Sequence, residues 1–86
     1  MPEVSRFLGI NITFNYDEHN PPHFHAKYGE YNGLFLIKEL RMSEGDLPKK
    51  VKNLILEWAD DHREELMEDW NLAREEQPLK KIKPLV

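Results

Sequence analysis

Cysteine is absent from this 86-residue chain. Its absence excludes structural disulfides, thiolate metal ligands and cysteine nucleophiles, and it fits a reducing compartment. A membrane segment is also lacking, because no window approaches the roughly 20 apolar residues that a spanning helix needs. The first six residues contain no apolar run long enough for a secretory signal peptide. We therefore expect a soluble, cytoplasmic protein with no membrane contact.

Positive charge is scarce as well. The chain has 12 basic and 16 acidic side chains, for a formal net charge of −4. Affinity for DNA and RNA comes largely from Lys and Arg side chains that neutralise phosphates, so an acidic chain argues against tight, independent binding of a nucleic acid. Residues 77–86 are the exception, because they contain three lysines and no acidic residue. We expect this segment to be a flexible basic tail.

The length of the chain allows one domain with a thin hydrophobic core. A large closed substrate cavity is not expected in such a domain, so an enzyme of this size would use a shallow groove or a subunit interface. We interpret residues 1–86 as a single domain. Residues 1–47 are its strand region, residues 48–76 its helical region and residues 77–86 its tail.

The strand region is recognised by its alternation of apolar and polar residues. The alternation is strict over residues 10–16, which is typical of a half-buried strand. Residues 23–28 and 31–36 predict two further strands, and residues 40–42 a short fourth, with turn-forming residues between them. The connections are too short for parallel crossovers, so we expect an antiparallel meander of three to four strands.

The helical region carries apolar residues at a 3.6-residue period from Val51 to Ala73. Asp61 and Glu64 have the spacing of a capping box, which predicts either two helices or one helix with a bend. Two amphipathic helices that cover the apolar face of a short sheet form a two-layer α+β sandwich. This is the fold class that we expect.

The stretch richest in chemistry is residues 17–25, D-E-H-N-P-P-H-F-H, which contain three of the four histidines. Imidazole suits acid–base chemistry, metal ligation and pH sensing. His23 and His25 project from the same face of an extended strand. The two prolines stiffen the loop, which lowers the entropy cost of holding His19 and Asp17 in place.

Three interpretations of this stretch stay open. A metal site would combine His23 and His25 with His19 or Asp17 into a three-ligand set with an open position, as in catalytic zinc sites. In metal-free acid–base chemistry, one imidazole would accept a proton while another donates one, and phosphodiester cleavage is the natural reaction for such a pair. In a structural role, Asp17 and Asn20 would make turn hydrogen bonds while the histidines link the loop to the sheet.

Candidate residues follow from these interpretations. Arg6 or Lys27 would neutralise a phosphate if the target is RNA. The fourth histidine, His62, falls on the apolar stripe of the helical region, and we interpret it as a hydrogen-bonded core residue. No cofactor is expected, and any metal would be held by the three histidines of the loop. The candidates for catalysis are Asp17, His19, His23 and His25, and the three histidines among them are also the metal candidates. The candidates for binding are Asn20, Arg6, Lys27 and Tyr28.

A column of acidic residues runs along the helical region at four-residue spacing. Like charges at this spacing repel by about 0.2–0.5 kcal/mol per pair. The column is either a solvated helix face or a docking surface for a basic protein partner, whose complementary field would speed association. Its members are Glu57, Asp61, Glu65 and Asp69.

Residues 2–10, the motif over residues 17–25 and residues 57–70 resemble a family of small bacterial proteins, the domain-of-unknown-function family 4160. The resemblance covers nearly the whole chain, and H-N-P-P-H-F-H is its specific motif. It implies the toxin role in a toxin–antitoxin-like pair, with a small protein partner encoded by a neighbouring gene. No catalytic assignment comes with the matching motif residues, which are Asp17, His19, Asn20, Pro21, Pro22, His23, Phe24 and His25.

We therefore expect a toxin-like component of such a pair, with a histidine-based activity directed at RNA. The first alternative is a non-catalytic protein-binding or regulatory module in which the H-N-P-P-H loop is structural. The second alternative is a metal-dependent hydrolase. The oligomeric state stays open.

Overall fold

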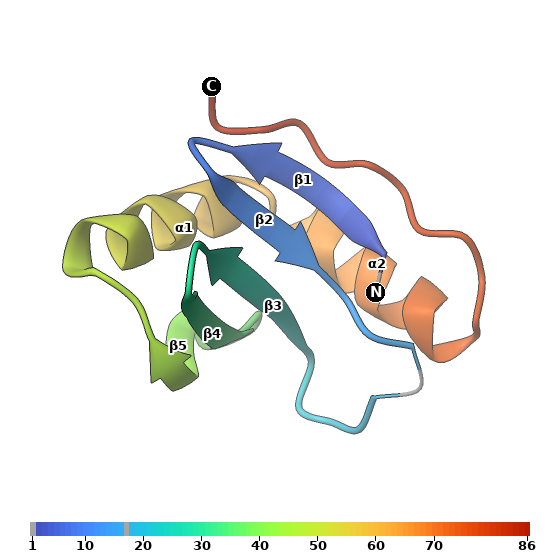
Figure 1. Ribbon diagram of the computed structural model, residues 1–86. Helices are drawn as coiled ribbons and strands as arrows, with labels where there is room; N and C mark the ends of the chain where they lie inside the picture. The colour runs from blue at the N-terminus through green and yellow to red at the C-terminus, as the bar shows by residue number, and fades with distance from the viewer. Residues whose placement is uncertain (1, 17) are drawn as a thin grey trace.

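The computed structural model describes residues 2–16 and 18–86. In them, five strands form one antiparallel sheet whose order follows the sequence, and two helices come after it (Figure 1). The predicted α+β meander is confirmed, with five strands instead of three to four. The elements are β1 (Glu3–Phe7), β2 (Ile10–Thr13), β3 (His23–Tyr28), β4 (Tyr31–Leu36), β5 (Arg41–Asp46), α1 (Lys49–Asp61) and α2 (Arg63–Arg74).

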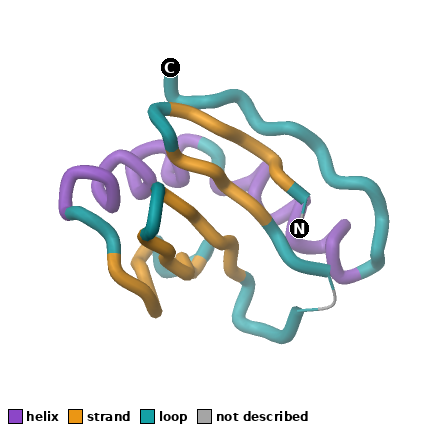
Figure 2. Tube along the Cα trace, in the orientation of Figure 1, coloured by secondary structure: helices purple, strands orange, loops and turns teal. Residues whose placement is uncertain are grey.

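Both helices pack against one face of the sheet, and the core lies between the two layers (Figure 2). Trp58 of α1 is fully buried there, with its ring 5.4 Å from that of Phe7 in β1 and 6.0 Å from that of Phe24 in β3. Leu66 and Trp70 bring α2 into the same core. No helix in the described part of the chain combines the length and apolarity needed to cross a membrane.

The strand β1 is not among the predicted strands. A β-bulge between Glu3 and Ser5 shifts its register against β2, and both Val4 and Ser5 are buried. Two adjacent buried residues interrupt the period-two alternation by which a strand is recognised in a sequence. The strand β5 also extends beyond the predicted residues 40–42. The prediction missed its last four residues because they are exposed and carry no hydrophobic signal.

The break between the two helices is confirmed, but its capping is different from the prediction. Asp61 is the last residue of α1, and His62 occupies the position before α2 without a side-chain cap. The predicted capping box of Asp61 and Glu64 is therefore wrong. Instead, Nδ1 of His62 lies 2.6 Å from Oε1 of Glu65, and its ring packs 5.5 Å from that of Trp58.

Residues 77–86 form no helix or strand, but they run back along β1 (Figure 1). The backbone N–H of Ile82 donates to the carbonyl of Val4 at 2.8 Å, and the side chain of Ile82 is buried. The indole N–H of Trp58 donates to the carbonyl of Lys83 at 2.8 Å. The lysines that suggest a flexible tail are exposed, while the apolar residue among them is packed into the core.

Candidate functional site

The loop that leads into β3 is hydrogen-bonded where it meets the strand. The N–H of Ile37 donates to the carbonyl of Pro22 at 3.1 Å. The Nδ1 atom of His23 lies 2.8 Å from the carbonyl oxygen of Pro21 and donates to it. The peptide bond between Asn20 and Pro21 is cis. The two hydrogen bonds, to Pro22 and to Pro21, fix the position of His23 at the start of β3.

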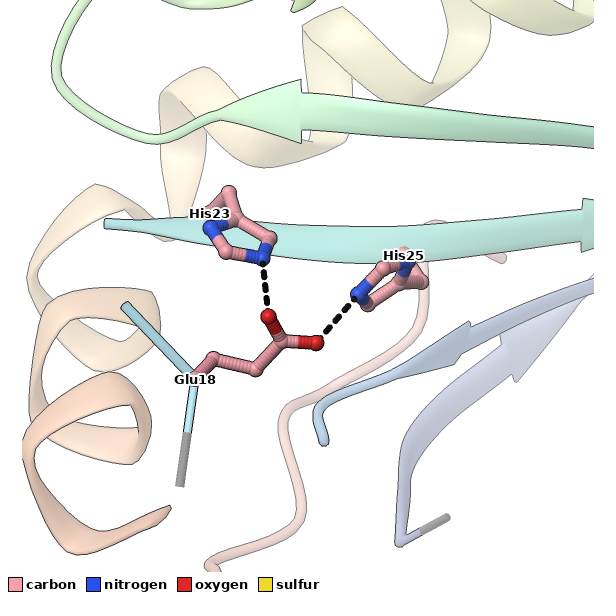
Figure 3. Close-up of side chains that lie close together, drawn as sticks. All are labelled: Glu18, His23 and His25. Atoms are coloured by element: carbon pink, nitrogen blue, oxygen red, sulfur yellow. Dashed lines mark hydrogen bonds and ion pairs between the residues drawn. The ribbon is translucent and has the colours of Figure 1, made fainter. Parts of the chain in front are cut away.

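A carboxylate lies between two imidazole rings at this point (Figure 3). Oε2 of Glu18 is 3.3 Å from Nε2 of His23, and Oε1 of Glu18 is 3.3 Å from Nε2 of His25. The two rings are nearly perpendicular, at 78°, with centroids 5.3 Å apart. One atom from each of the three residues that could bind a metal lies within 4.8 Å of the others. We call these three residues the Glu18 cluster.

The ring of His23 has one defined tautomer when it is neutral. A carbonyl oxygen only accepts hydrogen bonds, so the hydrogen is on Nδ1, which faces Pro21, and Nε2 carries a lone pair. The side chain is only 7% exposed, and the ring of Trp70 in α2 packs 5.0 Å away. Nε2 is buried and, despite its 3.3 Å contact with Glu18, has no hydrogen-bond partner among the described residues.

Glu18 is positioned by Asn15. The amide Nδ2 of Asn15 donates to Oε1 of Glu18 at 2.7 Å and also lies 3.2 Å from Nε2 of His25. The hydrogen bond from Asn15 holds the pKa of Glu18 below its ordinary value; burial opposes this shift, and the neighbouring His25 and His23 reinforce it. The carboxylate is therefore ionised over the neutral pH range.

The predicted catalytic residues do not all meet. His23 and His25 belong to the Glu18 cluster, whereas His19 is exposed in the loop and is outside it. Asp17 lies outside the described residues. Glu18, which sequence reasoning left unassigned, supplies the carboxylate instead. The only signal for it was its place in the motif, and nothing in the sequence pointed to Asn15.

The open face of the sheet, opposite the helices, carries a groove of about 590 Å³. It reaches from Arg6 in β1 across β2 and β3 to β4 and β5, and Asn11, Lys27 and Asn32 also line it. His25 lines the same groove. His25 therefore belongs both to the groove and to the Glu18 cluster, and a molecule in the groove would meet the cluster through this side chain.

The candidate binding residues are divided between the groove and other parts of the surface. Arg6 lines the groove but pairs with Glu3, at 3.0 Å between nitrogen and oxygen. Lys27 lines it as an exposed cation on β3. Asn20 is exposed in the loop. Tyr28 packs against the hydrophobic core and is not part of the groove wall.

The acidic column of the helices is exposed at three of its four positions. Glu57, Asp61 and Glu65 face solvent, but Asp69 is only 1% exposed. Its Oδ1 accepts a hydrogen bond from the backbone N–H of Lys80 at 2.9 Å. The prediction of Asp69 as a docking residue is therefore wrong, because residues 77–86 fold back over it.

Asp69→Asn is expected to flatten the dependence of stability on pH. Burial raises the pKa of Asp69 above its ordinary value of 3.8, although the hydrogen bond from Lys80 opposes the shift. The stability that this residue contributes is therefore full below the ordinary pKa and is lost as pH rises through the folded pKa. Asparagine keeps an oxygen for Lys80 and has no charge to bury. Urea unfolding at pH 4.5 and pH 7 should show that the free energy of unfolding of the variant, relative to that of the parent chain, increases as pH rises.

The matched control for this measurement is Asp60→Asn. Asp60 is 69% exposed, so removing its charge should change the stability almost equally at the two pH values. The expectation for Asp69 is refuted if Asp69→Asn loses more stability relative to the parent at pH 7 than at pH 4.5.

Comparison with known proteins identifies the family of the chain. Neither a search of curated proteins nor a search of solved structures gave a match. One family model, described as Domain of unknown function (DUF4160), matches residues 9–71. The match includes the Glu18 cluster and most of the sheet and helices, and it covers well over half of the 86 residues. The chain belongs to the DUF4160 family.

Proposed function

We propose that this protein is the toxin-like member of a bacterial toxin–antitoxin-like pair and that it cleaves RNA at the Glu18 cluster. The observation that carries the proposal is the double position of His25, in the cluster and in the groove. A strand of RNA lying in the groove would place a phosphodiester next to the cluster. A cytoplasmic location, where RNA is available, is part of the proposal.

The open face of the sheet offers the groups that a single strand of RNA needs. Asn11 and Asn32 supply amide donors and acceptors for sugars and base edges, and Lys27 supplies a cation for a phosphate. The acids Glu3 and Glu44 also line the groove. The groove therefore has little net positive charge, and we expect the protein to bind RNA weakly by itself and with little selectivity for sequence.

The geometry of the cluster limits how it acts on a phosphodiester. The rings of His23 and His25, with centroids 5.3 Å apart, leave no room for a phosphate between them. His23 is buried, whereas His25 is 29% exposed and Glu18 28% exposed. The groups that reach the substrate are therefore His25 and Glu18, and His23 forms the closed side of the cluster.

Expression of the protein without its genomic neighbour tests this function. Induced expression in a strain that lacks the neighbouring gene should slow growth, and co-expression of that gene should restore it. Cellular RNA should be fragmented in the first case and intact in the second. Harmless expression in the absence of the neighbour, at a level confirmed by immunoblotting, contradicts the toxin role.

A second candidate function is a non-catalytic module that docks a basic protein partner. It is favoured by Glu57, Asp61 and Glu65, which stay exposed around the junction of the two helices. In this case the partner would bind the helices, and the Glu18 cluster would only hold the loop to the sheet. This function predicts that His25→Ala leaves the growth phenotype of the protein unchanged.

A further inference from the structure

The Glu18 cluster brings together atoms that accept hydrogen bonds. Nε2 of His23 has a lone pair directed toward Oε2 of Glu18, because Nδ1 already donates to Pro21. An ionised carboxylate also only accepts. When His23 is neutral, two electron-rich atoms therefore face each other at 3.3 Å with no hydrogen between them, and Nε2 of His23 is buried. Such a contact is repulsive unless positive charge lies between the two atoms, as a proton on Nε2 or as a bound cation.

His25 adds a third acceptor to the same place. The amide nitrogen of Asn15 lies 3.2 Å from Nε2 of His25, and an amide NH₂ group can only donate. In the tautomer in which Nε2 of His25 accepts from Asn15, this atom presents a lone pair 3.3 Å from Oε1 of Glu18; in the other tautomer it donates to that oxygen. With His25 accepting from Asn15, two imidazole nitrogens and one carboxylate converge as acceptors.

We propose that the Glu18 cluster binds one divalent transition-metal ion of the zinc class. Its ligands are Nε2 of His23, Nε2 of His25 and the carboxylate of Glu18. A tetrahedral ion with bonds of about 2.0–2.1 Å has ligand atoms roughly 3.3–3.4 Å apart. Each ring nitrogen is 3.3 Å from one carboxylate oxygen, His23 from Oε2 and His25 from Oε1, and one ligand atom from each of the three residues lies within 4.8 Å of the others. Imidazole nitrogen is a ligand that zinc-class ions favour and that Mg²⁺ and Ca²⁺ do not.

The surroundings of the cluster have the form of an outer ligand shell. A histidine that binds a metal donates its other N–H to a carbonyl or carboxylate, which fixes the orientation of the ring. The carbonyl of Pro21 does this for His23. The amide of Asn15 orients the carboxylate of Glu18 in the same way. Both contacts come from the backbone or from a neutral side chain, so neither neutralises the charge of an ion.

The proposed ion is accessible from one side. His23 forms the closed side of the site, while His25 and Glu18 are each more than a quarter exposed. Because His25 also lines the groove, an ion with three protein ligands keeps an open position next to the groove. The inference uses the residues of the proposed reaction centre, but it does not depend on RNA being the substrate.

Titration of the full-length chain with Zn²⁺ tests the inference. The protein is purified without a histidine tag, treated with a chelator and studied by isothermal titration calorimetry. We expect one ion per chain with a dissociation constant in the micromolar range or below, and a rise in melting temperature. Loss of an outer-shell group costs 10–100-fold in affinity, so His25→Ala and Glu18→Gln, which each remove a direct ligand, should lower the affinity by about 100-fold or more. The control variants His19→Ala and His62→Ala should bind like the parent chain.

Co²⁺ provides a second measurement, because visible absorption of the Co²⁺-loaded chain reports the geometry of the site. Intense bands typical of four-coordination are expected in the parent chain and should be lost in Glu18→Gln, which has the shape of the parent side chain and should fold. Absence of Zn²⁺ binding overturns the proposal, as does binding that survives both His25→Ala and Glu18→Gln. A negative titration together with RNA cleavage would refute the metal site and leave the proposed function intact. Tight Zn²⁺ binding without toxicity would support the metal site and refute the proposed function.

Discussion

A chain that ends at Gln77 is expected to be largely unfolded at 25 °C. The truncation removes the buried side chain of Ile82, whose burial stabilises the fold by about 2–3 kcal/mol. It also leaves the indole N–H of the fully buried Trp58 without the carbonyl of Lys83, which costs about 1–3 kcal/mol. A combined loss of roughly 3–6 kcal/mol approaches the whole stability of a domain of this size. Circular dichroism and urea unfolding measure the effect.

Two full-length or nearly full-length variants make this experiment specific. A chain that lacks only Val86, which is 79% exposed, should keep the stability of the parent. Ile82→Ala in the full-length chain should lose about 2–4 kcal/mol, as is usual for such a truncation in a core. A parental unfolding midpoint for the chain that ends at Gln77 would show that the segment is the flexible tail expected from its lysines.

His25→Ala is expected to abolish the growth inhibition and to lower the rate of RNA cleavage by at least about 10²-fold, the lower end of what a catalytic side chain contributes. His25 is the imidazole that belongs to both the groove and the Glu18 cluster. The measurement combines growth after induction, without the neighbouring gene, with cleavage of a single-stranded RNA oligonucleotide by the purified protein. Melting curves establish that the variant is folded.

His19→Ala is the matched control for this prediction. His19 belongs to the same H-N-P-P-H motif but is exposed and outside the cluster. Its replacement should change growth inhibition and cleavage by less than about twofold. If His19→Ala is inactive and His25→Ala is active, the position of the Glu18 cluster has no bearing on activity. Retained toxicity in both variants would favour the docking module instead.

The parts of the fold that follow from a local period were predictable. The strands β3 and β4 have the bounds expected from residues 23–28 and 31–36, because their core-facing residues alternate with those of the open face. The helical region follows in the same way from a 3.6-residue period, whereas its break near His62 was predicted from a capping box that the structure does not contain. The strand β1 could not be found by this means, because the bulge makes Val4 and Ser5 adjacent buried residues.

Only the part of the site that lies on a regular strand was predictable from the sequence. The same-face placement of His23 and His25 follows from the geometry of a strand. The loop before them has no period, so spacing cannot distinguish Glu18 from its neighbours as the carboxylate that faces the rings. The burial of Asp69 was equally inaccessible, because it depends on the backbone of Lys80, which lies in a segment without secondary structure.

The contact between residues 77–86 and β1 has a consequence for synthesis. The amine of Lys81 donates to the carbonyl of Glu3 at 2.7 Å, across 78 positions of the chain, and Ile82 joins Val4 in the same place. Loops that span almost the whole chain are slow to close. During synthesis, the chain therefore has to leave the ribosome tunnel as far as Lys83 before residues 77–86 can pack beside β1. Until then, the β1 edge of the sheet is open to pairing with other chains.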